Sequence, residues 1–304
     1  MQAMLLAAGL GTRLQPYTHC LPKPLFPVLN RPLLYILIDI LHQAGCARIV
    51  VNGHHLSNLV QDAVGRMPDV RFQDEPTILG TGGSIREALE AFSDAPILVM
   101  NGDIFHTIDV GKVYRYHLDS GNRVTMALHD YPRFNTVTID SERIVTFNPA
   151  VESAKKNRMA FTGIHVVDPD VIRMIPPGRF HHIIDLYQSL AQKGEQVGYI
   201  RVDGSYWKDI GTPEDYLQLH EDLLTGGRAT PFALSAGNSK WLIDRQSSIA
   251  DDVLFEGWGC VGRAVIGRGA NLRNCVVWDN AVVQDGESLE NKIITPQSCD
   301  KRKL

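Results

Sequence analysis

Short apolar runs and helix-spaced apolar positions alternate along the first hundred residues. Residues 3–8 form a continuous apolar run that ends at Gly9, which predicts a strand buried on both faces. Residues 31–45 place leucine and isoleucine at helical spacing, with Gly45 as the stop. Further strand-like and helix-like segments then alternate: strands at 48–52, 70–75 and 96–103, helices at 55–64 and 84–92. This rhythm predicts an α/β fold with a doubly wound sheet, where ligands bind at the carboxyl ends of strands.

The middle of the chain is richer in strand-like segments. Three of them follow one another, at residues 123–130, 135–140 and 143–149. Residues 161–172 predict a strand and the start of a helix. Residues 205–224 predict a strand end, a turn and a helix, with Thr212 as the N-cap and Pro213 at the first helical position.

The pattern changes after residue 224. Residues 224–239 are rich in Gly, Ala, Ser and Thr and lack a clear period, which indicates a linker. Beyond it, small or aliphatic residues recur about every six positions, a spacing typical of a β-helix. We therefore expect a domain at 1–225, a linker at 226–245, and a short left-handed β-helix-like tail at 246–304.

Composition and charge narrow the class of partner. The chain has 304 residues, 44% of them hydrophobic, and a net charge of −4. Because no basic field covers the protein, we expect no nucleic-acid partner, and any anion must be held by a local site. The first ten residues are apolar but lack a basic flank and are too short for a membrane span, so we expect neither a signal peptide nor a membrane anchor.

The five cysteines are scattered and form no C-x-x-C arrangement. This argues against a disulfide framework and a zinc knuckle, and favours a reducing, cytoplasmic location. The adjacent His54 and His55 have no matching cluster of ligands in the sequence, so we expect them to be ordinary polar residues.

Candidate chemistry first appears in residues 6–28, LAAGLGTRLQPYTHCLPKPLFPV. Gly9 and Gly11 allow the backbone to turn and its N–H groups to converge on an anion, and Arg13 and Lys23 follow them. The stretch is not G-x-G-x-x-G, because position 14 is Leu, and it is not a Walker A loop, because Lys23 is too distant. On spacing alone, an anion site and a glycine turn with two surface cations stay equally open.

A family resemblance decides between these two. The pattern G-x-G-T-R followed by P-K-P-L-x-P-V resembles the signature of sugar-1-phosphate nucleotidyltransferases, also called nucleotide-sugar pyrophosphorylases. Three further blocks resemble the family: LGTGG at 79–83, NGD at 101–103 and WKDIGTPEDY at 207–216. The resemblance covers about residues 1–225 and implies a Rossmann-like nucleotidyltransferase domain with a mixed central sheet.

The resemblance also implies a reaction. An NTP and a sugar 1-phosphate give an NDP-sugar and pyrophosphate, and no general base is needed, because the sugar phosphate is already largely ionised at neutral pH. Arg13 and Lys23 are the implied catalytic residues, Arg13 on the β and γ phosphates and Lys23 on the α-phosphate and the attacking group. Asp103 and Asp209 are the implied ligands of Mg²⁺.

The remaining implied site residues bind the two substrates. The nucleotide-binding residues lie in three short segments: Ala7, Ala8, Gly9, Gly11, Thr12, Gly80, Thr81, Gly82 and Asn101. The sugar-binding residues are Gly83, Thr162 and Gly163. Residues 80–83 are expected to form a loop of small residues against the base and sugar, oriented by Glu75.

One departure from the family pattern concerns the sugar-phosphate anchor. Many members carry E-K-P after the central strands, whereas this chain has Asn148, which has no charge, before Pro149. The residues that can replace the missing lysine are Lys155, Lys156, Arg158 and Lys208.

The resemblance points to two different pairs of substrates. The LAAG opening and the missing E-K-P lysine are most similar to N-acetylmuramate-1-phosphate uridylyltransferases, whereas LGTGG resembles mannose- and heptose-1-phosphate guanylyltransferases. UTP and GTP therefore both stay open. The tail is expected to mediate self-association, with Trp258 and Trp278 as packing residues rather than a sugar platform.

Two alternatives belong to other classes. The first is a non-catalytic regulatory paralogue, which the presence of Arg13, Lys23, Asp103 and Asp209 argues against. The second is a cytidylyltransferase acting on phosphocholine, which needs an aromatic or acidic cage around the amine. Only Tyr206 and Trp207 are candidates for such a cage.

Overall fold

A computed structural model describes residues 1–147, 157–226 and 239–300. The chain divides into two compact units. Unit 1 comprises Met1–Gly9 and Leu37–Trp207, and unit 2 comprises Leu10–Ile36 and the chain from Lys208 onward. These units differ from the predicted division at residues 225 and 246, because the segment 10–36 and the helix after Lys208 group with the tail.

Unit 1 is built on a mixed β-sheet. The strand order is β5 (Val70–Asp74), β4 (Arg48–Gly53), β1 (Gln2–Leu6), β6 (Ile97–Asn101), β11 (Arg158–Val167), β8 (Val124–His129), β12 (Val197–Arg201), β10 (Arg143–Thr146) and β9 (Asn135–Asp140). β5, β4, β1 and β6 run parallel, and β11 runs antiparallel to β6 and β8. The predicted mixed α/β sheet is confirmed, and the apolar run at residues 3–8 supplies the central strand β1.

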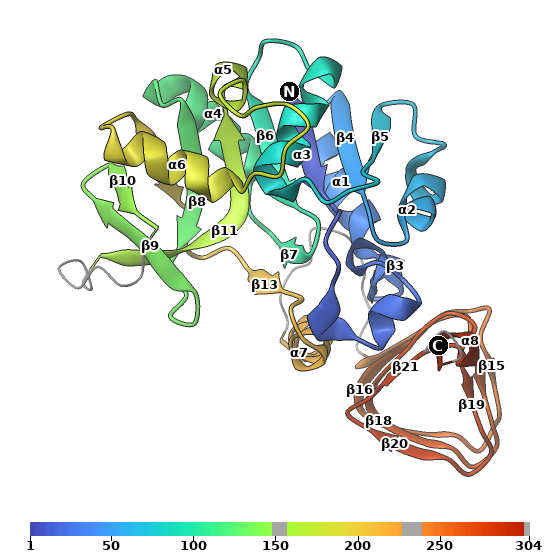
Figure 1. Cartoon of the computed structure of the whole chain (residues 1–304). Helices are drawn as coiled ribbons and strands as arrows, with labels where there is room; N and C mark the ends of the chain where they lie inside the picture. Colours follow the sequence, from blue (N-terminus) through green and yellow to red (C-terminus); the bar gives the residue numbers. More distant parts are fainter. Residues whose placement is uncertain (148–156, 227–238, 301–304) are drawn as a thin grey trace. The chain divides into compact units, whose positions relative to one another are not determined.

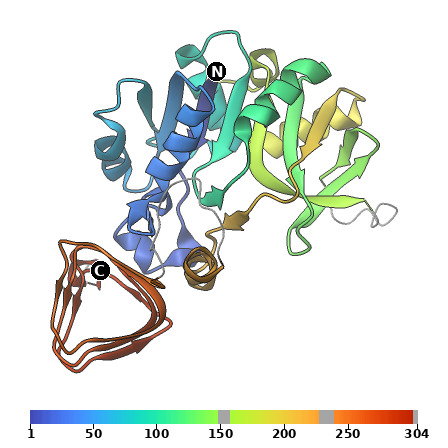
Figure 2. The ribbon, with the colours of Figure 1, turned by 180° about the vertical axis from the view of Figure 1, so that it is seen from behind.

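Helices cover both faces of this sheet. In unit 1 and at its borders they are α1 (Leu33–Gln43), α2 (Ser57–Val64), α3 (Gly80–Ala88), α4 (Val110–Ser120), α5 (Pro169–Ile172) and α6 (Ile183–Gln192). α3 and α6 lie in front of the sheet in Figure 1, and α1 and α4 in Figure 2. Met4 belongs to one buried cluster with Ile85 of α3 and residues of α5 and α6, while the alternate residues Ala3 and Leu5 are also fully buried. Burial on both faces explains why β1 is a continuous apolar run.

Unit 2 contains the tail, whose strands stack in parallel. They are β14 (Trp241–Ile243), β15 (Ser248–Ile249), β16 (Leu254–Val261), β17 (Val265–Ile266), β18 (Asn271–Val277), β19 (Val282–Val283), β20 (Ser288–Glu290) and β21 (Ile293–Ile294). Ser248 pairs with Val265, and Val265 with Val282, so equivalent positions of successive coils align. Figure 1 shows these coils as a triangular stack. The recurring aliphatic residues fill its interior, among them Ile266 and Leu272.

The tail packs against two other parts of unit 2, the segment 10–36 and helix α7 (Pro213–Thr225). The Trp278 indole N–H donates to the Tyr216 hydroxyl at 3.1 Å, and its ring lies edge-on to Phe26 at 4.7 Å. Asn30 donates to the Val261 carbonyl at 2.8 Å. Trp278 is 2% exposed, which confirms it as a packing residue.

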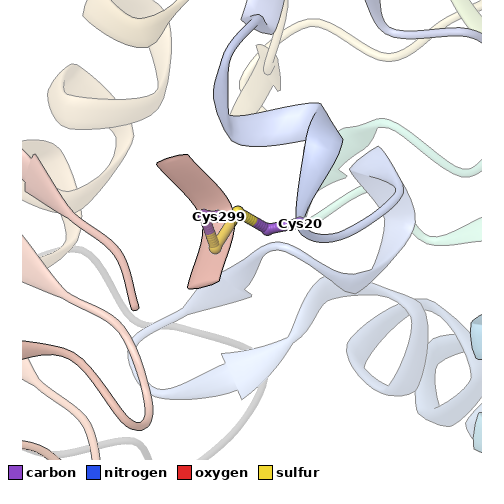
Figure 3. The surroundings of a disulfide bond; sticks show 2 residues. All are labelled: Cys20 and Cys299. Carbon is purple, nitrogen blue, oxygen red and sulfur yellow. A yellow bond between two sulfur atoms is a disulfide. The ribbon is translucent and has the colours of Figure 1, made fainter. Parts of the chain in front are cut away.

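One cysteine expectation is wrong. Cys20 and Cys299 form a disulfide within unit 2 (Figure 3), which joins the segment after η2 (Tyr17–His19) to α8 (Gln297–Asp300). Cys46, Cys260 and Cys275 are buried free thiols. The 279-residue separation of the bonded pair leaves no spacing signal in the sequence, so only the fold identifies it.

Short elements complete the described chain. They are η1 (Thr12–Leu14), η3 (Lys23–Leu25), β2 (Pro27–Val28), β3 (Arg31–Pro32), η4 (Leu89–Ala91), β7 (Ile104–His106) and β13 (Trp207–Asp209). Among the described residues, no helix is long and apolar enough to cross a bilayer.

Candidate active site

The first group of predicted residues lies at the carboxyl ends of β1 and β6 in unit 1. Leu6 is aligned with Asn101, and the Gly102 N–H donates to the Leu6 carbonyl at 2.8 Å. A Cβ at Gly102 would stand 2.7 Å from that carbonyl oxygen, so the N-G-D turn requires glycine here. Asn101 and Asp103 are thereby held beside the start of the predicted phosphate loop.

A buried hydrogen-bond network fixes the start of that loop. The Ala7 N–H donates to Asn52 Oδ1 at 2.7 Å, and Asn52 Nδ2 donates to Glu75 Oε1 at 2.8 Å. Glu75 also accepts from Ser84 Oγ at 3.0 Å, and from Gln73 Nε2 at 3.0 Å. The carboxyl of Glu75, which is 2% exposed, therefore connects the loop after β1 to helix α3.

This network contains one residue that the sequence predicted, Glu75, and one that it did not, Asn52. Glu75 was expected to orient the 80–83 segment, and its bond to Ser84 joins it to that helix. Asn52 was not singled out. The signal was an asparagine at the carboxyl end of the apolar strand β4, which is the edge where ligands bind in such sheets.

The LGTGG block is helical, and the predicted loop at 80–83 is wrong in that respect. Helix α3 begins at Gly80, whose φ of 69° is in the left-handed region. The N–H groups of Gly82 and Gly83 donate to the His181 carbonyl at 2.8 and 3.2 Å, and a Cβ at Gly83 would stand 2.6 Å from the Arg179 carbonyl. Because these residues are small, the chain at 179–183 can pack directly against their backbone. Their substrate contacts stay predictions.

The absence of a side chain at Gly163 leaves room for the side chain of Asn101. Gly163 has a φ of 78°, and a Cβ there would stand 2.8 Å from Asn101 Nδ2 and 2.7 Å from the Ile104 side chain. Thr162 is fully buried, and its hydroxyl donates to the Ala127 carbonyl at 2.8 Å. The Thr162 side chain thus serves the irregular pairing of β11 with β8. Its predicted sugar contact stays untested.

The second group of predicted residues lies in unit 2, in the segment after Gly9. Gly11 adopts φ 63°, and a Cβ there would stand 2.7 Å from Thr18 and 3.7 Å from the Lys23 stem. Thr12 and Arg13 then form the exposed turn η1, whereas Lys23 is 8% exposed. The two cations therefore differ: Arg13 projects into solvent, and Lys23 is buried beside the glycine turn.

The structure brings Arg13 and Asp209 together, although the sequence separates them widely. Arg13 Nη2 lies 4.0 Å from Asp209 Oδ2, with side chains 62% and 17% exposed. A Cβ at Gly211 would stand 2.8 Å from Asp209 Oδ2 and 3.1 Å from Arg13 Nη1. The glycine of WKDIG therefore leaves room for this pair, and an exposed guanidinium beside a carboxylate can receive phosphate oxygens and a cation.

The sugar-phosphate anchor is only partly described. Asn148, Lys155 and Lys156 lie outside the described residues. Lys208 Nζ lies 4.0 Å from Asp215 Oδ1, and its side chain is 12% exposed. Within the described residues, no cluster of three or more His, Cys, Asp or Glu is arranged to hold a metal. The His54 ring contacts the Glu75 carbonyl at 2.7 Å through Nδ1.

Trp207, one of the two residues of the candidate amine cage, is covered by other aromatic rings. Trp207 is 7% exposed and packs against His129, Tyr131 and Phe134 at centroid distances of 4.8–5.7 Å. Its indole N–H donates to the Thr162 carbonyl at 2.9 Å. Trp207 is therefore a packing residue of unit 1 and offers no open face to an amine.

Comparisons with known proteins identify the family of the chain. The sequence profile of the family described as nucleotidyl transferase matches residues 2–226. The chain is 30% identical to a mannose-1-phosphate guanylyltransferase of Mycobacterium tuberculosis, covering 95% of this chain and 83% of that protein. It is 28% identical to a UTP–glucose-1-phosphate uridylyltransferase of Synechocystis, covering 98% and 88%. Identity to a D-glycero-alpha-D-manno-heptose 1-phosphate guanylyltransferase of Campylobacter jejuni is 29%, covering 71% and 97%.

Solved structures share the fold. A glucose-1-phosphate thymidylyltransferase structure from Bacillus anthracis superposes with a TM-score of 0.65 at 20% identity, covering 77% of this chain and 98% of that one. HddC from Yersinia pseudotuberculosis gives a TM-score of 0.62 at 24% identity, covering 73% and 99%. At these identities the likeness concerns the fold alone.

Proposed function

Since the chain belongs to the nucleotidyl transferase family, we propose that it transfers a nucleotidyl group from an NTP to a sugar 1-phosphate. The observation that carries the proposal is the pairing of Arg13 with Asp209 over the side-chain-free position of Gly211. It joins the G-x-G-T-R and WKDIG blocks in one place. Arg13, Asp209 and the buried Lys23 all belong to unit 2.

The proposed roles follow from charge and shape. An oxygen of the sugar phosphate forms a bond to the α-phosphorus, and the bond from that phosphorus to the bridging oxygen breaks, so that pyrophosphate leaves with the electron pair. Arg13 binds the β and γ phosphates, because its planar fork contacts two oxygens at once. Lys23 contributes a compact charge to the α-phosphate. Positioning and charge neutralisation supply the catalysis, as in other phosphoryl transfers.

We propose magnesium as the cofactor, because the proposed ligands are carboxylates. Mg²⁺ prefers one or two carboxylates together with phosphate oxygens and water, and Asp103 and Asp209 are the proposed carboxylates. The small residue beside Asp209, Gly211, keeps that carboxylate clear of a side chain. When bound, the ion neutralises phosphate charge.

For the substrate pair we propose GTP with mannose 1-phosphate or heptose 1-phosphate first, and UTP second. The guanylyltransferase of Mycobacterium tuberculosis matches almost the whole of this chain, including the tail region, which supports the first pair. The uridylyltransferase of Synechocystis matches over a similar length, so UTP with glucose or N-acetylmuramate 1-phosphate belongs in the same test.

The test is pyrophosphate release with Mg²⁺ across five nucleotides (UTP, GTP, dTTP, CTP and ATP) and a panel of acceptors. The acceptors are mannose, heptose, glucose and N-acetylmuramate 1-phosphates, with phosphocholine as the non-sugar control. Arg13→Ala is expected to lower kcat/KM about 10³-fold or more, as for other arginines that contact transferring phosphates. Arg13→Lys should recover only part of it, since the fork is lost. The exposed Arg245→Ala in the tail is the matched control.

Two results contradict the proposal. Activity of Arg13→Ala equal to that of Arg245→Ala would remove the role given to Arg13. Silence of the folded wild type across the panel would favour the regulatory paralogue, and release only with CTP and phosphocholine would favour the cytidylyltransferase.

The tail carries a further part of this proposal. We infer that its parallel coils are a left-handed β-helix, and that a second copy of the chain docks on it. Val265 and Val282 support the docking, because they are aligned, 48% and 41% exposed, and form an apolar strip. The double variant Val265→Glu, Val282→Glu should lower the mass measured by light scattering. An unchanged mass would count against the strip.

A further inference from the structure

A cavity of about 740 Å³ lies within unit 2, and its lining does not include Arg13, Lys23 or Asp209. Three parts of the unit line it: the segment after Arg13, one side of α7, and one side of the tail. The lining residues are Gln15, Pro16, Tyr17, Pro213, Glu214, Leu217, Gln218, Glu221, Trp258, Asn274, Asn291, Lys292 and Ile293. Its volume is in the range of small-molecule sites.

The lining favours hydroxyl groups over phosphate. Amide side chains come from all three parts of the lining, and each offers both a donor and an acceptor. Two carboxylates, Glu214 and Glu221, accompany a single ammonium, Lys292. A phosphorylated ligand would therefore meet a net negative wall, whereas the hydroxyls of a neutral sugar can donate to carboxylates and exchange bonds with amides.

The amides are held in place before any ligand arrives. Asn274 Nδ2 donates to Asn291 Oδ1 at 3.0 Å across neighbouring coils. Gln218 Nε2 donates to Glu221 at 3.1 Å and to Asp222 at 3.0 Å. Preorganised polar groups lower the entropy lost on binding, so these contacts suit a specific site.

Aromatic rings complete the lining. Trp258 is 5% exposed, so only a small part of its surface contributes. Tyr17 packs against Trp278 at 6.3 Å between centroids, which fixes the segment that carries Gln15. This part of Trp258 and a fixed tyrosine give an apolar contact for the C–H face of a sugar beside the polar groups.

We propose that this cavity is an effector site for a neutral carbohydrate and that its occupation raises turnover. The rise in turnover rests on the proposed function. Gln15 follows Arg13 by two positions, and Pro213 begins the helix that follows Asp209 and Gly211. A ligand held by both segments therefore restrains the chain on either side of the Arg13–Asp209 pair, and a more restrained pair is better preorganised for phosphate.

The binding test uses isothermal titration calorimetry with mannose, glucose, maltose, trehalose and maltotriose, and with mannose 6-phosphate as the charged probe. Titrating both the wild type and Arg13→Ala keeps the result independent of catalysis. We expect at least one neutral sugar to bind both proteins. Gln218→Met conserves volume but removes the amide, and should weaken binding about fivefold, the factor expected for one hydrogen bond.

The matched control is Gln61→Met, an exposed glutamine on α2 in unit 1. It should bind the sugar as the wild type does. Equal affinity of the Gln218→Met and wild-type proteins would place the sugar elsewhere, including the sugar-phosphate subsite, and would overturn the proposal. Binding of mannose 6-phosphate alone, or of no probe at all, would also overturn it.

The coupling test adds the bound sugar to the pyrophosphate assay. A rise in kcat/KM in the wild type, with a smaller rise in Gln218→Met at the same sugar concentration, is the expected result. Sugar binding with unchanged or lowered turnover would refute the activating role. A wild type that binds sugar but releases no pyrophosphate from any pair would refute the proposed function and leave the binding site standing.

Discussion

Replacing Glu75 tests whether the buried network really holds the start of the phosphate loop. Glu75→Ala removes one side chain that accepts three hydrogen bonds, from Asn52, Gln73 and Ser84, at 2.8–3.0 Å. Because Glu75 and Ser84 are each 2% exposed and Asn52 is 1% exposed, two of the three donors would be left buried and without their acceptor. The backbone bond from the Glu75 N–H to the Gly53 carbonyl is retained.

The magnitude follows from these contacts. An unsatisfied buried donor costs about 1–3 kcal/mol, and a bond to a charged group contributes about 1.5–3 kcal/mol. Water entering the vacated space offsets part of this loss, so Glu75→Ala should lower the free energy of unfolding by about 3–5 kcal/mol. Glu75→Gln keeps one acceptor oxygen for Asn52 and Gln73 but places an amide N–H₂ against Ser84. We expect it to cost about 1–2 kcal/mol.

The assay is urea unfolding followed by circular dichroism, with the KM for the nucleotide measured alongside. Asn52 also accepts the Ala7 N–H, so a displaced Asn52 should release the loop after β1 and raise this KM more than it lowers kcat. Asp74→Ala is the control, because Asp74 is an exposed acid immediately before Glu75 in the chain. A Glu75→Ala protein within about 1 kcal/mol of Asp74→Ala, or with an unchanged KM, would refute the reasoning.

Three further predictions concern acid stability, the disulfide and the Arg13–Asp209 pair. Burial lowers the pKa of His106 and His220 to about 4 and that of His165 to about 3. As pH falls below about 6.5, the unfolded chain therefore binds protons before the folded chain does, and the free energy of unfolding should drop by about 3–4 kcal/mol between about pH 6 and about pH 5. Urea unfolding measures this drop. His165→Phe should remove about a third of it, and an equal drop in that variant would contradict the assignment. Cys20→Ser should lower the free energy of unfolding by about 2–5 kcal/mol, because the disulfide closes a long loop. Dithiothreitol should produce the same loss in the wild type but not in the variant. Five titratable thiols in the unreduced, denatured wild type would show that the bond is absent. Gly211→Ala places a methyl 2.8 Å from Asp209 Oδ2. It should lower kcat/KM about 10²-fold and raise the Mg²⁺ concentration needed for half-maximal rate. An unchanged Mg²⁺ dependence would contradict the ligand role of Asp209.

The sequence by itself determined many of the local elements and, through its motifs, the resemblance to a family. The apolar run before Gly9 forms the doubly buried strand that its pattern predicts. Thr212 caps α7 as predicted, its hydroxyl accepting from the Asp215 N–H at 3.2 Å. These outcomes depend on interactions between residues close in the chain, or on burial that a run of like residues reveals. The proposed phosphate-binding roles of Arg13 and Lys23 came from the family resemblance of their short stretch, because its spacing alone left an anion site and a glycine turn equally open.

Only the tertiary structure decided which distant residues meet. Residues 80–83 begin a helix rather than form a loop, because the chain at 179–183 approaches their bare backbone and takes two of their N–H groups. The bond between Cys20 and Cys299, and the pairing of Arg13 with Asp209, likewise join residues whose spacing carries no periodic signal. Such contacts depend on how the sheet and the coils bring segments together, and a local pattern cannot specify that.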